Sequence, residues 1–155
     1  MDFQQSIDIR GNAARVCNYF AQIENQQELH PLIYAVTQLA DSGEGTLPRI
    51  REYQIEENVP FLGIFKMKNR YRVRSSSGNL PNELVFEAFS QPNVQLHNRI
   101  FFEQISPEMM RVTEQVAITS PAILKGFVKK TAYKAHSQML ARLKEVMERE
   151  TDQAK

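Results

Sequence analysis

Polar and apolar residues alternate with a period of two over most of the chain that precedes Ser120. Such alternation is typical of strands that bury one face. It predicts a first strand at residues 3–10 and six further strands, at 34–40, 48–57, 64–75, 83–89, 94–105 and 109–118. The segments between the later strands contain Gly, Pro, Asn or Ser, as turns require. The pattern therefore predicts a meander of strands.

Two short helices are expected directly after the first strand. Asn12 is a good cap for a helix at 13–23, where apolar residues recur every three or four positions. A second helix, at 26–29, should end before His30 because the residue that precedes a proline is disfavoured in a helix. These two elements separate the first strand from the meander.

A single long helix is predicted from Pro121 to about Glu150. Ser120 is placed to cap it, and proline is tolerated in a first turn because its missing amide hydrogen has no partner there. An apolar stripe should face the strands: Leu124, Phe127, Val128, Thr131, Ala135, Met139, Leu143 and Val146. Because no other segment is long enough to cover the apolar face of a sheet, we expect an α+β fold in which this helix does so.

Composition limits the classes of protein to consider. A chain of 155 residues with 42% hydrophobic residues is the size of one domain, so we expect a single domain over 1–155. The net charge of +1 gives no general attraction to nucleic acid or to an acidic membrane. Cys17, the one cysteine, suits a buried core position better than a reactive thiol, and rules out an intramolecular disulfide. Without a secretory pattern or a membrane span, a cytoplasmic location is expected.

This order of elements resembles the helix-grip domains of the START-like, birch-pollen-allergen-like and polyketide-cyclase superfamily, also called SRPBCC. The resemblance also rests on local cues, which are His30-Pro31, the segment Met110-Arg111-Val112-Thr113-Glu114, and Ser120-Pro121. Many relatives carry a tryptophan before the His-Pro pair, and this sequence has none. The resemblance implies a curved, seven-stranded antiparallel sheet wrapped around the C-terminal helix, often with an internal cavity for a hydrophobic ligand.

Strand alternation predicts which side chains face such a cavity. Glu114 shares one face of the last strand with Met110, Val112, Val116 and Ile118. The same argument places Leu96, Asn98, Ile100 and Phe102 inward on the neighbouring strand, and Phe65, Met67, Asn69, Tyr71 and Val73 on another. Tyr53 and Ile55 point inward if the charged residues beside them point outward. The candidate ligand-binding residues are Glu114, Asn98, Tyr71, Tyr53, Asn69, Phe102, Met67 and His30.

Glu114 is the strongest functional candidate because an inward carboxylate needs a partner or water. A local ion pair or hydrogen bond without a ligand role would explain it equally well. His30 suits a capping or packing role more than a ligand contact, and His97 and His136 are expected at exposed or peripheral positions. Tyr53 and Tyr71 are typical of core rings with a hydrogen-bonded hydroxyl.

The expected hairpin tip at 58–63 is unusually apolar, with Val59, Pro60, Phe61 and Leu62 in a position that should contact water. In helix-grip relatives the corresponding loop overhangs the cavity mouth. The resemblance therefore implies a gate made by these four residues with Leu124 and Val128 of the last helix. Packing of the tip against the helix, or burial in a homodimer, are the alternatives, so a monomer and a homodimer both remain open.

Five cations alternate along one predicted strand, and we call this set the basic strand: Lys66, Lys68, Arg70, Arg72 and Arg74. Glu52, Gln54 and Glu56 alternate along the preceding strand and should lie opposite them. Such pairing favours a surface ladder over a site for RNA or anionic lipid. Nucleic acid is further disfavoured because no aromatic residue for base stacking shares the face.

The sequence contains no motif of a phosphate loop, a metal site or a nucleophile elbow, and no cofactor is expected. The favoured function is a carrier or binding protein that holds a hydrophobic small molecule or lipid in an internal cavity. One alternative is an enzyme similar to polyketide cyclases and dehydratases, with Glu114 as general base and Tyr71 or His30 as acid. Another is an adaptor that binds RNA or a protein through the basic strand.

Overall fold

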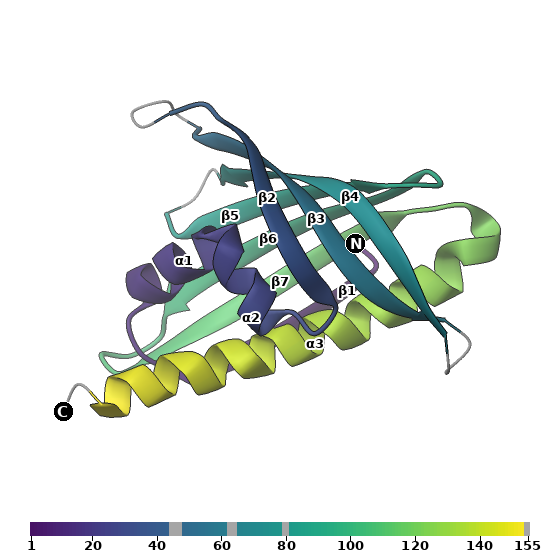
Figure 1. Ribbon diagram of the computed structural model, residues 1–155. Coiled ribbons are helices and arrows are strands. Elements are labelled where there is room, and N and C mark those ends of the chain that lie inside the picture. The colour runs from purple at the N-terminus through teal and green to yellow at the C-terminus, as the bar shows by residue number, and fades with distance from the viewer. Residues whose placement is uncertain (44–47, 62–64, 79–80, 154–155) are drawn as a thin grey trace.

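The computed structural model describes residues 1–43, 48–61, 65–78 and 81–153. Over these residues the chain forms one seven-stranded antiparallel sheet, in the order β1-β7-β6-β5-β4-β3-β2, with a long helix across its inner face (Figure 1). The strands are β1 (Phe3–Arg10), β2 (Ile33–Asp41), β3 (Ile50–Phe61), β4 (Phe65–Ser77), β5 (Glu83–Ser90), β6 (Val94–Gln104) and β7 (Met109–Thr119). The helices are α1 (Ala13–Ala21), the 3-10 turn η1 (Ile23–Asn25), α2 (Gln26–Leu29) and α3 (Ala122–Gln153).

The topology confirms the predicted fold class. Strands β2 to β7 follow one another as a meander, and β1 then pairs with β7 at the edge of the sheet. The sheet curves over α3, while α1 and α2 lie at the end of the sheet where the C-terminal half of α3 also lies (Figure 1). This arrangement leaves the N-terminal half of α3 under strands β3 to β7 without a second helix beside it.

Local interactions explain the helix ends. Asn12 caps α1 as predicted, since its Oδ1 accepts a hydrogen bond from the backbone N–H of Arg15 at 3.1 Å. The cap predicted at Ser120 is wrong, because the Oγ atom of Ser120 is buried and has no hydrogen-bond partner among the described residues. The carbonyl of Pro121 instead accepts from the N–H of Leu124 at 2.9 Å, and α3 begins one residue later than predicted.

The β3–β4 hairpin is longer than the sequence pattern indicates. Val59 and Pro60, which were expected in a turn, belong to β3 and lie opposite Met67 and Lys66 of β4. The apolar residues of the expected tip therefore continue the strand alternation. Leu62 lies outside the described residues.

The main core lies between the sheet, α1 and the C-terminal half of α3. Its most deeply buried members come from these three parts and, in the case of Leu29, from α2: Ile9, Val16, Phe20, Leu29, Ile55, Ile100, Met110, Val112, Met139 and Leu143. Cys17 belongs to it, as predicted, and burial raises the pKa of its thiol to about 11. Along the first half of α3, by contrast, Leu124, Phe127, Val128 and Thr131 are only partly buried.

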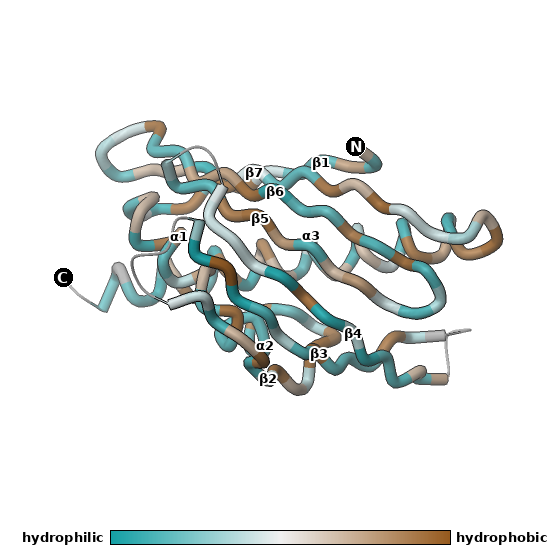
Figure 2. The backbone as a smooth tube through the Cα atoms, turned by 90° about the horizontal axis from the view of Figure 1, so that it is seen from above, coloured by the Kyte–Doolittle hydropathy of each residue, from teal (hydrophilic) through white to brown (hydrophobic). Residues whose placement is uncertain are grey.

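The predicted alternation of faces holds in the central strands. In β7 the residues from Met110 to Ile118 alternate between buried and more exposed, with Glu114 on the buried face, and β6 follows the same rule. Figure 2 shows the corresponding alternation of hydrophilic and hydrophobic positions along the strands. Phe65 and Met67 are on the inward face of β4 but are exposed. They lie at the beginning of this strand, which extends past the covered part of the sheet.

The outer face of β4 carries the basic strand, and its predicted pairing with β3 is confirmed. The register places Glu52, Gln54 and Glu56 opposite Arg74, Arg72 and Arg70. Arg70 and Glu56 approach to 2.8 Å, and Arg74 and Glu52 to 3.2 Å. Lys66 and Lys68 lie opposite Pro60 and Asn58. Acidic residues of β3 are therefore opposite the basic strand only in its second half, at Arg70 and Arg74. A role for this surface in binding RNA or a protein stays a prediction.

Candidate functional site

A cavity of about 540 Å³ lies between the N-terminal half of α3 and the inner face of β3 to β6. The half of the wall made by α3 is almost entirely apolar, with Leu124, Phe127, Val128, Ala132 and Ala135. The sheet and the end of α2 supply the other wall: His30, Leu32, Glu57, Val59, Met67, Asn69, Tyr71, Ala88, Ser90, Val94 and Leu96. The cavity forms where the core described above ends.

Glu57 brings a carboxylate into this cavity from β3. It has the same strand parity as Tyr53 and therefore points inward. Its two oxygens accept hydrogen bonds from Asn69 Nδ2 at 3.0 Å and from Tyr71 Oη at 3.3 Å, both on the neighbouring strand β4. Burial raises the pKa of Glu57, although these two hydrogen bonds and the charge on His136 act in the opposite direction.

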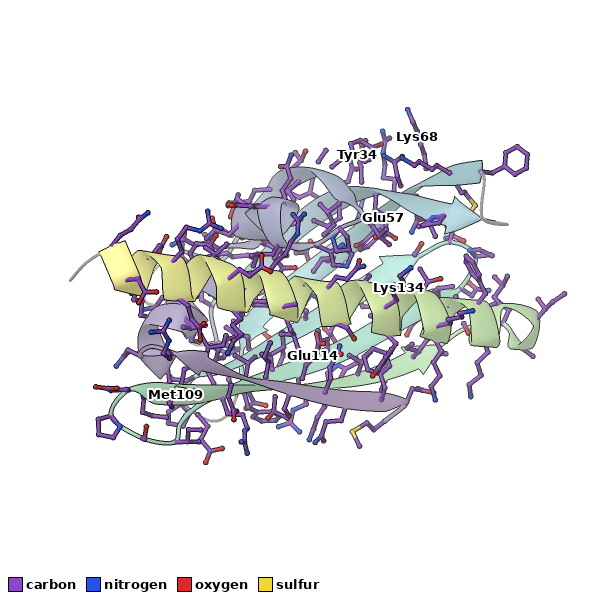
Figure 3. The ribbon with its side chains drawn as sticks, turned by 90° about the horizontal axis from the view of Figure 1, so that it is seen from below. Tyr34, Glu57, Lys68, Met109, Glu114 and Lys134 are labelled. Carbon is purple, nitrogen blue, oxygen red and sulfur yellow. The ribbon has the colours of Figure 1, made fainter. Side chains whose placement is uncertain are left out.

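Glu114 of β7 lies on the other side of α3 from Glu57, as Figure 3 shows. It is fully buried and accepts three side-chain hydrogen bonds, from His136 Nδ1 at 2.7 Å, Asn98 Nδ2 at 2.6 Å and Gln5 Nε2 at 2.9 Å. Burial alone would raise the pKa of Glu114, but the charge on His136 and the three hydrogen bonds together hold that pKa below its ordinary value. Glu114 is therefore an ionised carboxylate with partners on three elements.

His136 connects Glu114 to the cavity. Its side chain is 13% exposed and lines the cavity wall, while its Nδ1 atom faces Glu114. Burial would lower the pKa of His136, but the charge and hydrogen bond of Glu114, with the charge of Glu57, raise that pKa above its ordinary value. The two residues thus form a buried ion pair in which the carboxylate fixes the orientation of the ring. The Nε2 atom has no partner among the described residues.

A second imidazole lies beside the first. His30 ends α2, and its ring centroid is 5.7 Å from that of His136 with the rings nearly perpendicular. Burial and the positive charge on His136 lower the pKa of His30 to about 3, and the charge of Glu114 offsets this only in part. His30 is therefore neutral. Because its Nδ1 atom accepts from the N–H of Leu32 at 3.4 Å, its proton is on Nε2.

An inner chamber of about 70 Å³ continues the cavity toward the core. It shares His30, Tyr71, Ala88, Leu96 and His136 with the cavity wall. Its remaining wall is apolar except for Gln26 and Asn98: Phe20, Ile23, Ile33, Ile55, Val73, Phe86 and Met139. The two imidazoles and Tyr71 therefore mark the boundary between a wide outer cavity and a small inner one.

The structure places the predicted ligand-binding residues at four kinds of position. His30, Met67, Asn69 and Tyr71 line the cavity, and Asn98 lines the inner chamber. Glu114 points inward as predicted, but it lies behind His136 and is not among the residues that line the cavity or the inner chamber.

Tyr53 and Phe102 do not line the cavity, contrary to the prediction. Both are buried in the main core, where Phe102 packs on Phe20 of α1 at a centroid distance of 5.8 Å. The strand parity was right for both residues, but α1 and the second half of α3 cover that end of the sheet, so the same inward face contributes to the core there.

The predicted gate residues are also divided. Val59, Leu124 and Val128 line the cavity. Pro60 is exposed and is not among the residues of the wall. Phe61 is described only by its backbone in β3, and Leu62 lies outside the described residues. Gating by this hairpin stays a prediction.

Sequence reasoning missed Glu57 and misplaced His136. Glu57 continues the inward series of Tyr53 and Ile55, so the alternation that identified Glu114 also indicates Glu57. His136 was expected at an exposed or peripheral position, and this is wrong. It lies four residues after Ala132 and four before Leu140, on the face of α3 that contacts the sheet. His97 is half exposed, as expected.

Among the described residues there is no cluster of side chains suited to a metal ion, and no helix has the length and hydropathy needed to cross a membrane.

Comparisons with solved structures show which fold this is. The Zhui aromatase/cyclase from a Streptomyces species superposes with a TM-score of 0.76 at 11% identity, over 96% of this chain and 94% of that one. A START superfamily protein from Mycobacterium smegmatis gives 0.66 at 15% identity, over 95% and 97% of the two chains. The chain has the helix-grip fold of the START-like superfamily. No family model and no curated protein matches the sequence.

A third helix-grip structure indicates how this fold is used within longer chains. The di-domain aromatase/cyclase StfQ of the steffimycin biosynthetic pathway superposes with a TM-score of 0.74 at 14% identity. The match covers 97% of this chain but only 46% of StfQ, so this chain spans about half its length. At such identities the likeness establishes the fold and not the ligand.

Proposed function

We propose that this protein binds a hydrophobic small molecule in the cavity under α3, with a polar end of that molecule directed at the two imidazoles. One observation carries the proposal. Three polar side chains, those of His30, His136 and Tyr71, line both the cavity and the inner chamber, while Leu124, Phe127 and Val128 line only the cavity. A ligand with one polar end and an apolar body matches this distribution.

The size of the cavity supports the same conclusion. Sites for small molecules occupy roughly 300–1,000 Å³ and are mainly apolar, with a few placed polar groups. The cavity of about 540 Å³ lies within that range. Burial of the apolar body would supply most of the affinity, at roughly 25 cal/mol for each Å² removed from water. The polar end would then set orientation and selectivity.

Native mass spectrometry of gently purified protein tests this function. The expected result is a mass that exceeds that of the chain by one defined small molecule, extractable into organic solvent. Val128→Glu places a charge on the cavity wall and should abolish the added mass. Lys129→Glu changes the neighbouring exposed residue and should retain it. Wild-type protein that is repeatedly empty, and that also takes up no hydrophobic probe, would contradict the proposal.

A second candidate function is catalysis of a cyclisation or dehydration, and one arrangement favours it. Glu57 is a partly buried carboxylate with a raised pKa, and His136 is a largely buried imidazole held by Glu114, and both line one cavity. Pairs of buried titratable groups of this kind are typical of acid–base sites. Two of the similar structures are aromatase/cyclases.

In that function the general base would be Glu57 and not Glu114. Glu114 lies behind His136 and its pKa is lowered, so it is a poor base and has no access to the cavity. Its role would be to orient His136 and to stabilise the imidazolium. Glu57 would remove a proton next to a carbonyl group, and His136 Nε2–H would stabilise the negative charge that develops on the carbonyl oxygen. His30, with a pKa of about 3, is a neutral imidazole at neutral pH and therefore lacks the second ring proton that a general acid would give.

Turnover of a short β-polyketone, followed by absorbance of the aromatic product, distinguishes catalysis from binding alone. Glu57→Gln should abolish turnover and leave affinity for the probe within a few fold, because the shape of the side chain is kept. Glu56→Gln changes the neighbouring residue on the outer face of β3 and should leave turnover unchanged. Wild-type protein that binds the polyketone without converting it would support the binding function and exclude this activity for that substrate class.

A further inference from the structure

The amide of Asn98 leaves one atom without a partner. Its Nδ2 end must face Glu114, because an ionised carboxylate can only accept a hydrogen bond, and the two atoms are 2.6 Å apart. The Oδ1 end is buried and has no hydrogen-bond partner in the described part of the chain. Asn98 itself is 5% exposed and lines the inner chamber. A buried acceptor left unpaired costs about 1–3 kcal/mol, so a donor from outside the chain is expected here.

The same chamber contains donors. His30 carries its proton on Nε2, since Nδ1 accepts from Leu32. His136 uses Nδ1 toward Glu114, so the imidazolium form has its second N–H, on Nε2, free of described partners. Both rings belong to the wall of the chamber, together with Asn98. Side chains that carry one unpaired acceptor and two N–H donors among the described residues thus line a space of about 70 Å³ whose other walls are mostly apolar.

We propose that the inner chamber is a subsite for a hydroxyl group, alcoholic or phenolic, at the end of a hydrophobic ligand. The hydroxyl hydrogen would be donated to Asn98 Oδ1, and the hydroxyl oxygen would accept from an imidazole N–H. This inference rests on the proposed binding function and names the class of its ligand.

Other polar ends match this chamber less well. A ketone or an ether accepts from an imidazole but has no hydrogen for Asn98 Oδ1, which would remain buried and unpaired. A carboxylate pairs with the imidazolium but brings a negative charge next to an amide oxygen and close to Glu114. A hydroxyl is the smallest group that both donates and accepts, which is what the chamber requires.

Isothermal titration calorimetry with four naphthalenes tests the proposal: 2-naphthol, 2-methoxynaphthalene, 2-naphthoate and naphthalene. They share one apolar skeleton and differ only in the group at one position. We expect 2-naphthol to bind about tenfold more tightly than the methoxy compound, the gain of one satisfied hydrogen bond with a buried partner. The selectivity is the dissociation constant of 2-methoxynaphthalene divided by that of 2-naphthol. A substitution that weakens the fold in general affects both constants, so its effect cancels in this ratio.

Two matched variants locate the selectivity. Asn98→Leu should reduce the ratio to about one. Gln5→Leu removes another donor to Glu114, at 2.9 Å, without changing the wall of the chamber, and should keep the wild-type ratio. A ratio that survives Asn98→Leu would overturn the role given to Asn98.

The remaining outcomes separate this inference from the proposed function. Equal binding of all four compounds by the wild type would show a chamber satisfied by water, which overturns the hydroxyl subsite and leaves the binding function intact. Tighter binding of 2-naphthoate than of 2-naphthol would assign the subsite to an anion and also overturn it. Failure of all four to bind up to their solubility would contradict the binding function itself.

Discussion

Glu114, His136 and His30 lie within one small volume, and their surroundings give them different charges. Glu114 is ionised because three donors reach it, and His136 is protonated because Glu114 and Glu57 favour the imidazolium. His30 has only a backbone N–H as a described hydrogen-bond partner and lies next to the positive ring, so it remains neutral. Glu114 and His136 each shift the pKa of the other, and both shift the pKa of His30, so a substitution at either of the two should be measurable at the other residues.

Removing the charge of Glu114 should destabilise the fold and change the titration of His136. Glu114→Gln leaves a buried imidazole without its counter-ion, and loss of one member of a buried pair costs about 3–5 kcal/mol. The pKa of His136, followed by NMR of its ring protons, should fall because both effects of Glu114 that raise it are lost. Urea denaturation measures the free energy of unfolding.

The matched control for this substitution is Glu56→Gln on the outer face of β3, where the ion pair with Arg70 is exposed to solvent. It should change the free energy of unfolding far less, because exposed pairs contribute little. Equal losses in the two variants would show that Glu114 and His136 do not form a charged pair.

His30 should make the protein less stable in acid. Its folded pKa of about 3 is below the ordinary 6.5, so between these values the unfolded chain binds more protons than the folded one. Stability from this residue is complete above pH 6.5 and is lost as pH falls toward 3, at about 1.4 kcal/mol for each pH unit. The advantage of the wild type over His30→Gln in urea denaturation should therefore shrink steadily from pH 6.5 to pH 4. A constant difference would contradict a neutral His30.

At the scale of single residues, strand parity was the most reliable guide from the sequence. It identified the inward direction of Glu114 and Asn98, and applied to Glu57 it gives the correct answer as well. His136 was misplaced because helical spacing on a partly polar face is weaker evidence than strict alternation. Its partner Glu114 is on a different element, and no local pattern relates residues that meet only through tertiary packing.

At the scale of elements, the two halves of α3 perform different tasks. The C-terminal half carries Met139, Leu140, Leu143 and Met147, which are almost fully buried, and α3 packs against β1 and α2. The N-terminal half contributes partly buried residues to the cavity wall. The stripe predicted from spacing was continuous, and the structure divides it because α1 and α2 cover only one end of the sheet.

The same substitution in the two halves should therefore have different consequences. Leu143→Ala creates a void in the core and should cost about 2–5 kcal/mol of unfolding free energy. Leu124→Ala enlarges a space that is already open and should cost less than about 1 kcal/mol, while it weakens binding of a hydrophobic probe. Urea denaturation and calorimetry measure the two effects. A stability loss at Leu124 as large as that at Leu143 would show that the cavity is closed in solution.

The ends of elements were harder to predict than their kinds. The alternation that defines β3 and β4 continues through Val59 and Pro60, whereas Asn58, Pro60 and Gly63 had suggested a turn. Ser120 matched the statistics of a helix cap, but its buried hydroxyl has no partner in the described part of the chain, and Pro121 provides the first accepting carbonyl. Both errors have one cause. The local preferences of residue types determine where a strand or helix ends only when no contact with a distant segment favours another end.

At the scale of the whole molecule, the cavity is a consequence of covering a long curved sheet with one long helix and one pair of short ones. The covered end forms the core, and the other end keeps about 540 Å³ of space. The order of elements predicted this arrangement, but the volume depends on how side chains from distant segments interlock. A protein with such a space gains stability from whatever fills it, because a ligand that binds only the folded state shifts the unfolding equilibrium.

Ala88 offers a way to test this coupling, because its small side chain lies where the cavity meets the inner chamber. Ala88→Phe should block the passage and fill existing space, so the ligand-free stability should change little. At 100 times the dissociation constant, 2-naphthol should stabilise the wild type by about 2.7 kcal/mol, and Ala88→Phe should lose most of this gain. Ala141→Phe, on the exposed side of α3, should keep it. Urea denaturation with and without 2-naphthol measures all three proteins. An undiminished gain in Ala88→Phe would mean that the ligand binds elsewhere, because a side chain that fills the junction cannot coexist with a ligand that extends through it.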